Sequence, residues 1–344
     1  MLPKIQTLDS YVPVYRDTAA WLPAMQAICR RHGLVQDSLR LAPPGSNIVF
    51  WVEPGCLIKL FAPMWAADAA REAGALHAMT GVPGIDVPRI TAQGELEGWP
   101  YLVITRLPGR PLDELWPDLG AAERLEIARG LGRLMAALHS APTDSLAALQ
   151  EDWPAFLRQQ VQACLGQQRE KGVSPEWAAQ IEAFLADLPP LYDAGFQPVL
   201  LHADLNPEHL FCTQGVAGWQ VSGVIDFGDA MLGHPCYEFI RTSFLLGPNQ
   251  PDLRRAMLLA YGYPAEALDE AFSCRMMAYT LLHRFASLPE LLESFEIPPH
   301  TLAELQAGLW GLSGGTDRLN DSSEKDQDLP EMKNYRLDLY KIGR

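Results

Sequence analysis

Apolar residues recur at two different periods along the chain, and the change of period marks the expected elements. Residues 15–32 carry apolar side chains three and four positions apart, and residues 65–79 are rich in alanine, so we predict a helix in each stretch. Residues 48–52 and 57–61 are short and rich in strand-forming residues, with Glu53-Pro54-Gly55 between them. This pattern predicts the two strands of a hairpin.

The chain changes character after a further short apolar segment. Residues 101–105 predict another strand, and the proline and glycine residues at 108–111 mark a break after it. Beyond this break the pattern is mainly helical, with an apolar stripe along residues 121–139. Further helices are predicted at residues 152–170, 175–188 and within 236–312. We therefore predict three parts, a small lobe of residues 1–106, a helical lobe of residues 107–318 and a disordered tail of residues 319–344.

Two short apolar runs interrupt the helical half, and each precedes a cluster of polar residues. The run at 198–201 leads into a segment with His202, Asp204 and His209, and the run at 221–225 leads into Asp226. If the two runs are adjacent strands, their ends deliver Asp204 and Asp226 to one place. One carboxylate could then accept a proton while the other holds a metal, which is the minimum that phosphoryl transfer from Mg-ATP to a hydroxyl requires.

The composition limits the class of protein and its partners. The chain has 344 residues, enough for two domains, and 48% of them are hydrophobic. The formal net charge of −15 argues against nucleic acid or an anionic membrane as a partner. The six cysteines form no C-x-x-C pair, and the sequence has neither a signal-peptide pattern nor an apolar run long enough to span a bilayer. We therefore expect a cytoplasmic protein, either a monomer or a homodimer.

Each of the two aspartates has a structural alternative to a chemical role. Asp204 precedes a proline-containing turn, and it either acts as a general base toward a hydroxyl or caps that turn. Asp226 ends an apolar run, where an ionised carboxylate is costly unless a cation or hydrogen bonds compensate for the lost water. A Mg²⁺ ion bound to nucleotide phosphates provides that compensation, and the backbone amides of the following turn are the alternative.

A lysine and a glycine-containing turn in the first half are candidates for phosphate binding. Lys59 lies inside an apolar strand and needs a partner, for which Glu72 on the helix of residues 65–79 is the candidate. The alternative is that Lys59 points outward to solvent. The turn Gly45-Ser46-Asn47 precedes the strand at 48–52, and its amides could lie over phosphates, although an ordinary hairpin turn fits the same residues.

The order of these features resembles the aminoglycoside phosphotransferase and small-molecule kinase family. A glycine turn, a strand lysine, a helix glutamate, a His-x-Asp and an Ile-Asp-Phe-Gly-Asp follow one another, and the resemblance is most specific at residues 201–211, 223–230 and 233–238. It implies an α+β fold of the two-lobed protein-kinase type, with a small antiparallel-sheet lobe on a mainly helical lobe. It also implies that ATP and Mg²⁺ are used to phosphorylate a hydroxyl of a small molecule.

Carried onto this chain, the resemblance gives a role to each matching residue. Asp204 is the expected catalytic base and Asp226 the expected magnesium ligand. Lys59, paired with Glu72, is expected to contact the α- and β-phosphates. His202 is expected to brace the loop that carries Asp204.

The remaining matches concern the adenine and the surroundings of the catalytic residues. The backbone from Thr105 to Leu107 is expected to receive the adenine through hydrogen bonds. Asp229 and Glu238 are expected either to support the site or to face the substrate. One position departs from the pattern, because His209 stands where many members place an asparagine that helps to hold the metal. Imidazole is a poorer magnesium ligand than an amide oxygen, so His209 could change the metal preference or weaken turnover.

Three functions remain open from the sequence. The first is a phosphotransferase that acts on an antibiotic such as an aminoglycoside or macrolide, or on a choline-, sugar- or homoserine-type acceptor; acidic residues in the segment 152–193 favour a cationic acceptor. The second is a pseudokinase that binds nucleotide with little turnover, as His209 would allow. The third is a metallohydrolase built from His202, Asp204, His209 and Asp226, which leaves Lys59 and Glu72 unexplained.

Overall fold

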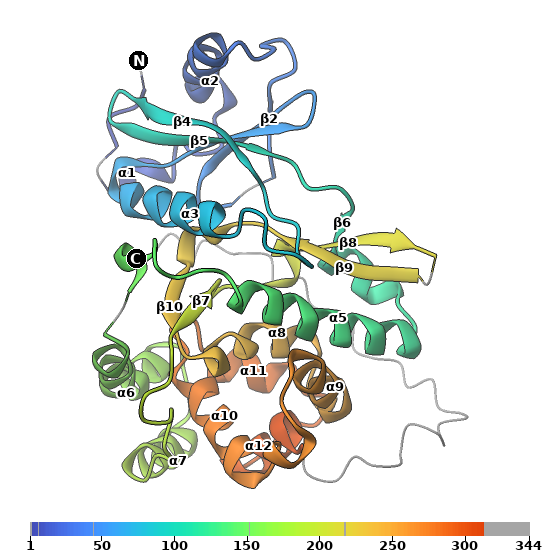
Figure 1. Cartoon of the computed structure of the whole chain (residues 1–344). Coiled ribbons are helices and arrows are strands. Elements are labelled where there is room, and N and C mark those ends of the chain that lie inside the picture. Colours follow the sequence, from blue (N-terminus) through green and yellow to red (C-terminus); the bar gives the residue numbers. More distant parts are fainter. Residues whose placement is uncertain (1, 6, 44, 151, 217, 313–344) are drawn as a thin grey trace.

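The chain forms a small sheet-containing lobe above a larger helical lobe (Figure 1). The computed structural model describes residues 2–5, 7–43, 45–150, 152–216 and 218–312. The N-terminal lobe contains one antiparallel sheet with the strand order β1-β2-β3-β5-β4. Its strands are β1 (Arg40–Leu41), β2 (Ile48–Val52), β3 (Cys56–Leu60), β4 (Ile90–Leu96) and β5 (Trp99–Thr105). The predicted fold class, a protein-kinase-like α+β fold, is confirmed by the structural matches described below.

Alternation of side chains along the strands gives the sheet two buried faces. One face packs on α2 (Thr18–His32), with Phe50 and Ile58 in the same core as Trp21. The other face turns to α3 (Ala66–Ala78) and the helical lobe. Because Lys59 follows Ile58 by one residue, it projects to this second face, where it is 5% exposed. The alternative in which Lys59 points to solvent is therefore wrong.

The two predicted strands of the helical lobe belong to different sheets. β7 (Val199–Leu201) pairs with β10 (Met231–Gly233), whereas β9 (Gly218–Val224) pairs with β8 (Leu210–Gly215), which pairs with β6 (Arg110–Pro111). The expectation that the strands before Asp204 and Asp226 are neighbours is therefore wrong. β8 and β9 are joined by a short connection, so they form a local hairpin, and β7 finds its partner in the segment after Asp226.

Helices make up most of the second lobe. The central helix is α5 (Ala121–His139), which coincides with the predicted stripe and packs along α9 (Pro251–Tyr261). Gly132 allows this close packing, because a Cβ at that position would collide with the Met257 carbonyl oxygen. The other helices are α1 (Leu8–Tyr11), α4 (Leu112–Leu115), α6 (Trp153–Glu170), α7 (Pro175–Ala186), α8 (Phe239–Leu245), α10 (Glu270–Leu282), α11 (Leu288–Glu293) and α12 (Leu302–Trp310). Within the described ranges, no helix is long and apolar enough to span a membrane.

Two backbone connections join the lobes, in addition to the packing of α3 on the residues after Asp226. The chain crosses between them after β5, where the Arg106 amide still donates to the Gly55 carbonyl at 2.8 Å. The second connection is at Asp86, which precedes β4 and pairs with β9: its amide donates to Ser222, and its carbonyl accepts from Val224. Gly223 permits this approach, because a Cβ there would lie 2.6 Å from the Asp86 carbonyl oxygen. The division of the chain at residue 106 stays a prediction, and the tail predicted at 319–344 lies outside the described residues.

Candidate active site

The loop after β7 holds Asp204 in a fixed place through its backbone. Glu238 is 1% exposed, and its carboxylate accepts from the amides of His202 and Ala203 at 2.6 and 3.0 Å. Ala203 has a φ of 62°, a conformation that is costly for a residue with a Cβ and persists when its surroundings enforce it. Glu238 is therefore buried against this loop and holds two of its backbone amides.

His202 ties this loop to the strand that leads to Asp226. Its Nε2 donates to the Ile225 carbonyl at 2.9 Å, and its Nδ1 accepts from the Asp204 amide at 3.3 Å. A ring that donates through Nε2 and accepts at Nδ1 is neutral, because a protonated imidazole has no acceptor nitrogen. Burial and the nearby His209 ring lower the pKa of His202, which favours that neutral form. These two bonds join the Asp204 loop to the strand before Asp226, and the bracing role of His202 stays a prediction.

The side chain of Asp204 is oriented by two residues that sequence analysis did not identify. Its Oδ1 accepts from Asn206 Nδ2 at 2.9 Å and lies 3.7 Å from Arg241 Nε. Arg241, on α8, also donates to the Asn206 side-chain oxygen, so the amide group is held with its nitrogen toward Asp204. Asp204 is 1% exposed, so its orientation is strongly defined.

Lys59 binds two carboxylates that arrive from distant parts of the chain. Its ammonium lies 2.6 Å from Glu72 Oε2 and 2.8 Å from Asp226 Oδ1. Although burial alone would lower the pKa of Lys59, the two carboxylates raise it overall, so the ammonium stays charged. Burial raises the pKa of Glu72 to about 7, against the opposing effect of Lys59. Asp226 itself has a φ of 68°, a left-handed conformation that is uncommon for a residue with a Cβ.

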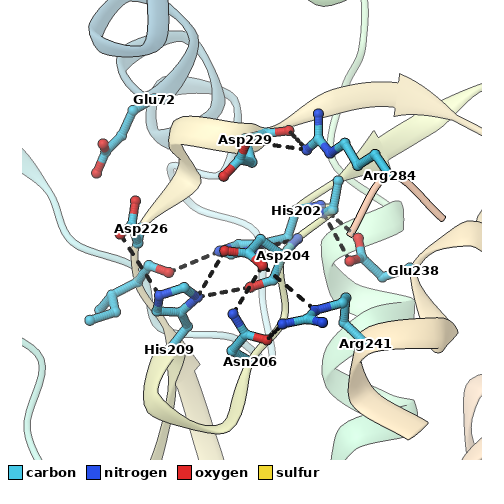
Figure 2. A network of polar contacts seen from close by, with 12 residues as sticks. Glu72, His202, Asp204, Asn206, His209, Asp226, Asp229, Glu238, Arg241 and Arg284 are labelled. Atoms are coloured by element: carbon cyan, nitrogen blue, oxygen red, sulfur yellow. Dashed lines mark hydrogen bonds and ion pairs between the residues drawn. The ribbon is translucent and has the colours of Figure 1, made fainter. Parts of the chain in front are cut away.

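His209 lies between the two aspartates (Figure 2). Its Nδ1 donates to the Asp204 backbone carbonyl at 2.8 Å and lies 3.9 Å from Asp204 Oδ2. Its Nε2 lies 3.8 Å from Asp226 Oδ2. Both carboxylates are therefore within about 4 Å of one imidazole ring, even though their strands are in different sheets.

The same contacts decide whether a metal ion fits. Among the described residues, no group of three or more histidine, cysteine, aspartate or glutamate side chains could hold a metal. Asp226 and His209 nevertheless present two donors side by side, because the Nδ1 bond fixes the ring with Nε2 toward the carboxylate. A Mg²⁺ ion commonly takes one or two protein ligands and completes its shell with phosphate and water oxygens. The residues present fit such an ion.

The turn Gly45-Ser46-Asn47 and the backbone from Thr105 to Leu107 were the remaining candidates for nucleotide binding. Ser46 accepts a hydrogen bond from the Tyr11 hydroxyl at 2.9 Å through its carbonyl, and Gly45 and Asn47 flank it just before β2. Within the described residues, Asn47 Oδ1 is buried without a hydrogen-bond partner. The Thr105 amide donates to the Arg89 carbonyl at 2.9 Å, so this N–H is not available to an adenine. Leu107 follows at the lobe crossing, with its side chain against Gly223.

Further residues of the site come from elements whose role the sequence did not reveal. Arg284, which follows α10, donates to the Asp229 carbonyl at 2.7 Å and lies 3.4 Å from its carboxylate. His139 lies at the end of α5 and is buried. Its Nδ1 is 2.9 Å from the Tyr261 hydroxyl, and its Nε2 is 3.7 Å from Glu238 Oε2, so it belongs to the support beneath Asp204. No local pattern distinguishes His139 from the other helical histidines.

This arrangement, a lysine bound to two carboxylates beside an aspartate loop, is that of a kinase-type phosphotransferase. Residues 40–271 match the sequence model of the phosphotransferase enzyme family, and the chain belongs to this family. The predicted resemblance is thereby confirmed. Sequence comparison with curated proteins gives no significant match.

Solved structures of antibiotic kinases have a similar fold. The GDP complex of wild-type aminoglycoside 2′-phosphotransferase-IIIa superimposes with a TM-score of 0.62 at 17% identity, covering 83% of this chain and 98% of the other. Macrolide 2′-phosphotransferase MphH from Brachybacterium faecium gives a TM-score of 0.57 at 21% identity, covering 88% and 99%. The ternary complex of streptomycin, ATP and APH(2″)-IIa gives 0.56 at 15% identity, covering 75% and 89%. At these identities the similarity establishes the fold.

Proposed function

We propose that the protein transfers the γ-phosphate of ATP to a hydroxyl group of a small molecule. The observation that carries this proposal is the position of His209, whose ring lies within 4 Å of the carboxylates of both Asp204 and Asp226. Lys59 adds the positive charge next to Asp226 at 2.8 Å. A base, a metal-binding carboxylate and a phosphate-binding cation are therefore together, as in-line phosphoryl transfer requires.

Two halves of the site have different tasks in this proposal. The nucleotide side consists of Lys59, Glu72, His209 and Asp226. The acceptor side consists of Asp204, Asn206, Arg241 and Arg284. On the nucleotide side, Lys59 would bind the nucleotide phosphates while Glu72 holds the ammonium in place. A Mg²⁺ ion held by Asp226 and His209 would neutralise charge on the phosphates.

The acceptor side would position the attacking oxygen. The Asp204 carboxylate would accept a hydrogen bond from the acceptor hydroxyl, align its oxygen with the γ-phosphorus and take the proton as the bond to phosphorus forms. Asn206 and Arg241 keep the Asp204 carboxylate in one orientation, so little reorganisation is needed when the acceptor arrives. The leaving group is ADP.

The first test is acceptor-dependent release of ADP by the purified protein and by the Asp204→Asn variant. Macrolides, aminoglycosides, choline, sugars and homoserine are the acceptors to screen. With an active acceptor, Asp204→Asn should lower kcat about a thousandfold, because loss of a positioned base removes about 10²–10⁴ in rate. Asp118→Asn removes an exposed carboxylate away from the site and serves as the matched control.

A pseudokinase is the competing function, and it is motivated by the imidazole of His209 in the metal position. It predicts nucleotide-induced stabilisation of the fold without acceptor-dependent ADP release. If ATP raises the melting temperature and no acceptor increases ADP release above that of Asp204→Asn, the pseudokinase is favoured and the transferase proposal fails.

A further inference from the structure

Two arginines lie beside Asp204, on the side away from Glu72 and Asp226. The guanidinium carbons of Arg241 and Arg284 lie 5.7 and 5.0 Å from the centre of the same ring, that of Phe285. In Figure 2 both arginines lie on one side of Asp204. The residues on the opposite side are Glu72, His209 and Asp226. In-line transfer places the γ-phosphorus between the bridging oxygen of ATP and the attacking oxygen of the acceptor. The nucleotide would lie on the side of Glu72 and Asp226, so the arginines on the other side of Asp204 are placed to meet the acceptor.

Further positive charge lies near this pair. Lys171 donates to the Ala286 carbonyl at 2.7 Å, next to Phe285 in the chain. Burial, together with the charges of Arg241 and Arg284, holds the pKa of His283 well below its usual value. The His283 ring is therefore neutral, and the positive charge of this region is carried by the two arginines and the lysine. The facing carboxylates are Asp204, Asp229 and, beside Lys171, Glu290.

Each arginine donates one hydrogen bond to the protein through one Nη, and its second Nη remains for a ligand. Arg241 donates to the Asn206 side-chain oxygen through one Nη, and Arg284 donates to the Asp229 carbonyl in the same way. The second Nη of each donates to no residue that the structure describes. In the described part of the chain, the Nε of each arginine is buried without a hydrogen-bond partner. The side chains are 23% and 21% exposed.

We infer that the acceptor carries an anionic group, a carboxylate or a phosphate, and that Arg241 and Arg284 bind it. The inference rests on the proposed function and specifies its substrate class. Guanidinium groups recognise carboxylate and phosphate oxygens through paired donors, and here the donors are held in place before the ligand arrives. A positively charged acceptor would meet two guanidinium groups next to Asp204, and their repulsion would weaken its binding relative to that of an anion. The local charge thus opposes the cationic acceptor that the acidic composition favours.

In this reaction one bond to phosphorus forms and another breaks. The acceptor oxygen forms a bond to the γ-phosphorus, and the bond from this phosphorus to the β–γ bridging oxygen breaks. The hydroxyl proton passes to Asp204, and ADP leaves. The product is a phosphomonoester of a hydroxy acid or of a hydroxylated phosphate ester.

The test compares four small probes that share a glycerol skeleton and differ in charge. Glycerate carries a carboxylate, glycerol 3-phosphate a phosphate, glycerol no charge and 3-amino-1,2-propanediol an ammonium. The melting temperature of the full chain is measured with each probe in the presence of ADP. We expect glycerate or glycerol 3-phosphate to raise it, and the stronger of the two identifies the anion. Glycerol and the amine should have no effect.

Variants decide whether the arginines are responsible. Arg284→Gln should weaken binding of the effective anion at least about tenfold, since a hydrogen bond to a charged group contributes about 1.5–3 kcal/mol. Arg284→Lys should lose most of this affinity as well, because it keeps the charge and loses the paired donors. Arg133→Gln makes the same substitution on an exposed side chain of α5 and should bind like wild type. Should Arg284→Gln fail to fold, Arg241→Gln gives the same binding readout.

Three results would overturn the inference. Neither anion stabilises the protein, both arginine variants bind the anion as wild type does, or the amine binds best. This readout needs no turnover, so it is separate from the ADP-release test with Asp204→Asn, whose failure would instead reject the proposed function.

Discussion

The nucleotide side and the acceptor side treat positive charge in opposite ways. On the nucleotide side, Lys59 is buried and bound to two carboxylates, so its charge is neutralised within the protein. On the acceptor side, Arg241 and Arg284 are partly exposed; each bonds a neutral oxygen and lies farther from a carboxylate, at 3.7 Å from Asp204 and 3.4 Å from Asp229. A nucleotide has to compete with Glu72 and Asp226 for Lys59, whereas an anionic acceptor would meet guanidinium groups that are less closely paired.

The largest effect is expected from Lys59→Met, which removes the centre of the nucleotide side. We expect kcat/KM for ATP to fall about a hundredfold or more, because a positioned cation on the phosphates is lost. The fold should be retained with a loss of about 1–3 kcal/mol, since removing one partner of a buried pair is costly. The raised pKa of Glu72, about 7, limits this loss of stability, because its carboxylate can take up a proton near neutral pH.

A double variant separates the two effects of Lys59→Met. Adding Glu72→Gln removes the uncompensated carboxylate, so urea unfolding should show stability close to wild type while ATP turnover stays low. Unchanged ATP kinetics in Lys59→Met would show that this lysine does not bind the nucleotide, and the comparison of the two sides would no longer hold.

The second prediction concerns His234, which follows β10 behind the acceptor side. Its Nδ1 accepts from the Cys236 amide, and burial, together with the charge of Arg275, lowers its pKa to about 4. Its usual pKa is 6.5, so the unfolded chain binds more protons between these values. This contribution to stability is complete above about pH 6.5 and falls by about 3 kcal/mol as the pH drops toward 4.

Replacing His234 by asparagine should reduce this pH dependence, because an asparagine side chain can accept from the Cys236 amide without titrating. Urea unfolding at several pH values between about 4 and 7 measures the change. The exposed His77→Asn is the matched control and should keep the wild-type slope. Equal slopes for wild type and His234→Asn would show that the acid sensitivity originates elsewhere.

The smallest effect is expected from His209→Asn on the nucleotide side. An amide oxygen suits Mg²⁺ better than imidazole does, so Mg²⁺-dependent ATP turnover should stay within about threefold of wild type or increase. The ratio of Mn²⁺-supported to Mg²⁺-supported turnover should fall. Complete loss of activity would instead assign a dedicated role to the imidazole, which the Nδ1 bond to the Asp204 carbonyl could provide.

The sequence predicted features that depend on neighbouring positions along the chain. The stripe at residues 121–139 matches α5 at both ends, because a helix buries one face at a fixed period. The pairing of Lys59 with Glu72 was accessible because a lysine among apolar strand residues needs a partner. By contrast, β4 was not predicted, since this edge strand contains Gly94 and mostly exposed residues.

What the sequence did not reveal depends on packing between distant elements. Arg241 and Arg284 come from α8 and from the segment after α10, and nothing near either residue indicates that its guanidinium reaches Phe285. The sequence left Glu238 between a supporting and a substrate-facing role, because no local pattern indicates that its carboxylate is buried against the amides of His202 and Ala203. The pairing of β7 with β10 likewise depends on which strand is free to pair, which no local pattern specifies.

The attachment of Asp86 to β9 limits how the lobes can move. Together with the chain crossing after β5, it ties the lobes at the backbone, while Lys59 with Asp226 and Arg71 with the Gly228 carbonyl join them through side chains. The side-chain contacts can separate while the backbone connections stay in place, so nucleotide entry would be coupled to release of the Lys59–Asp226 ion pair.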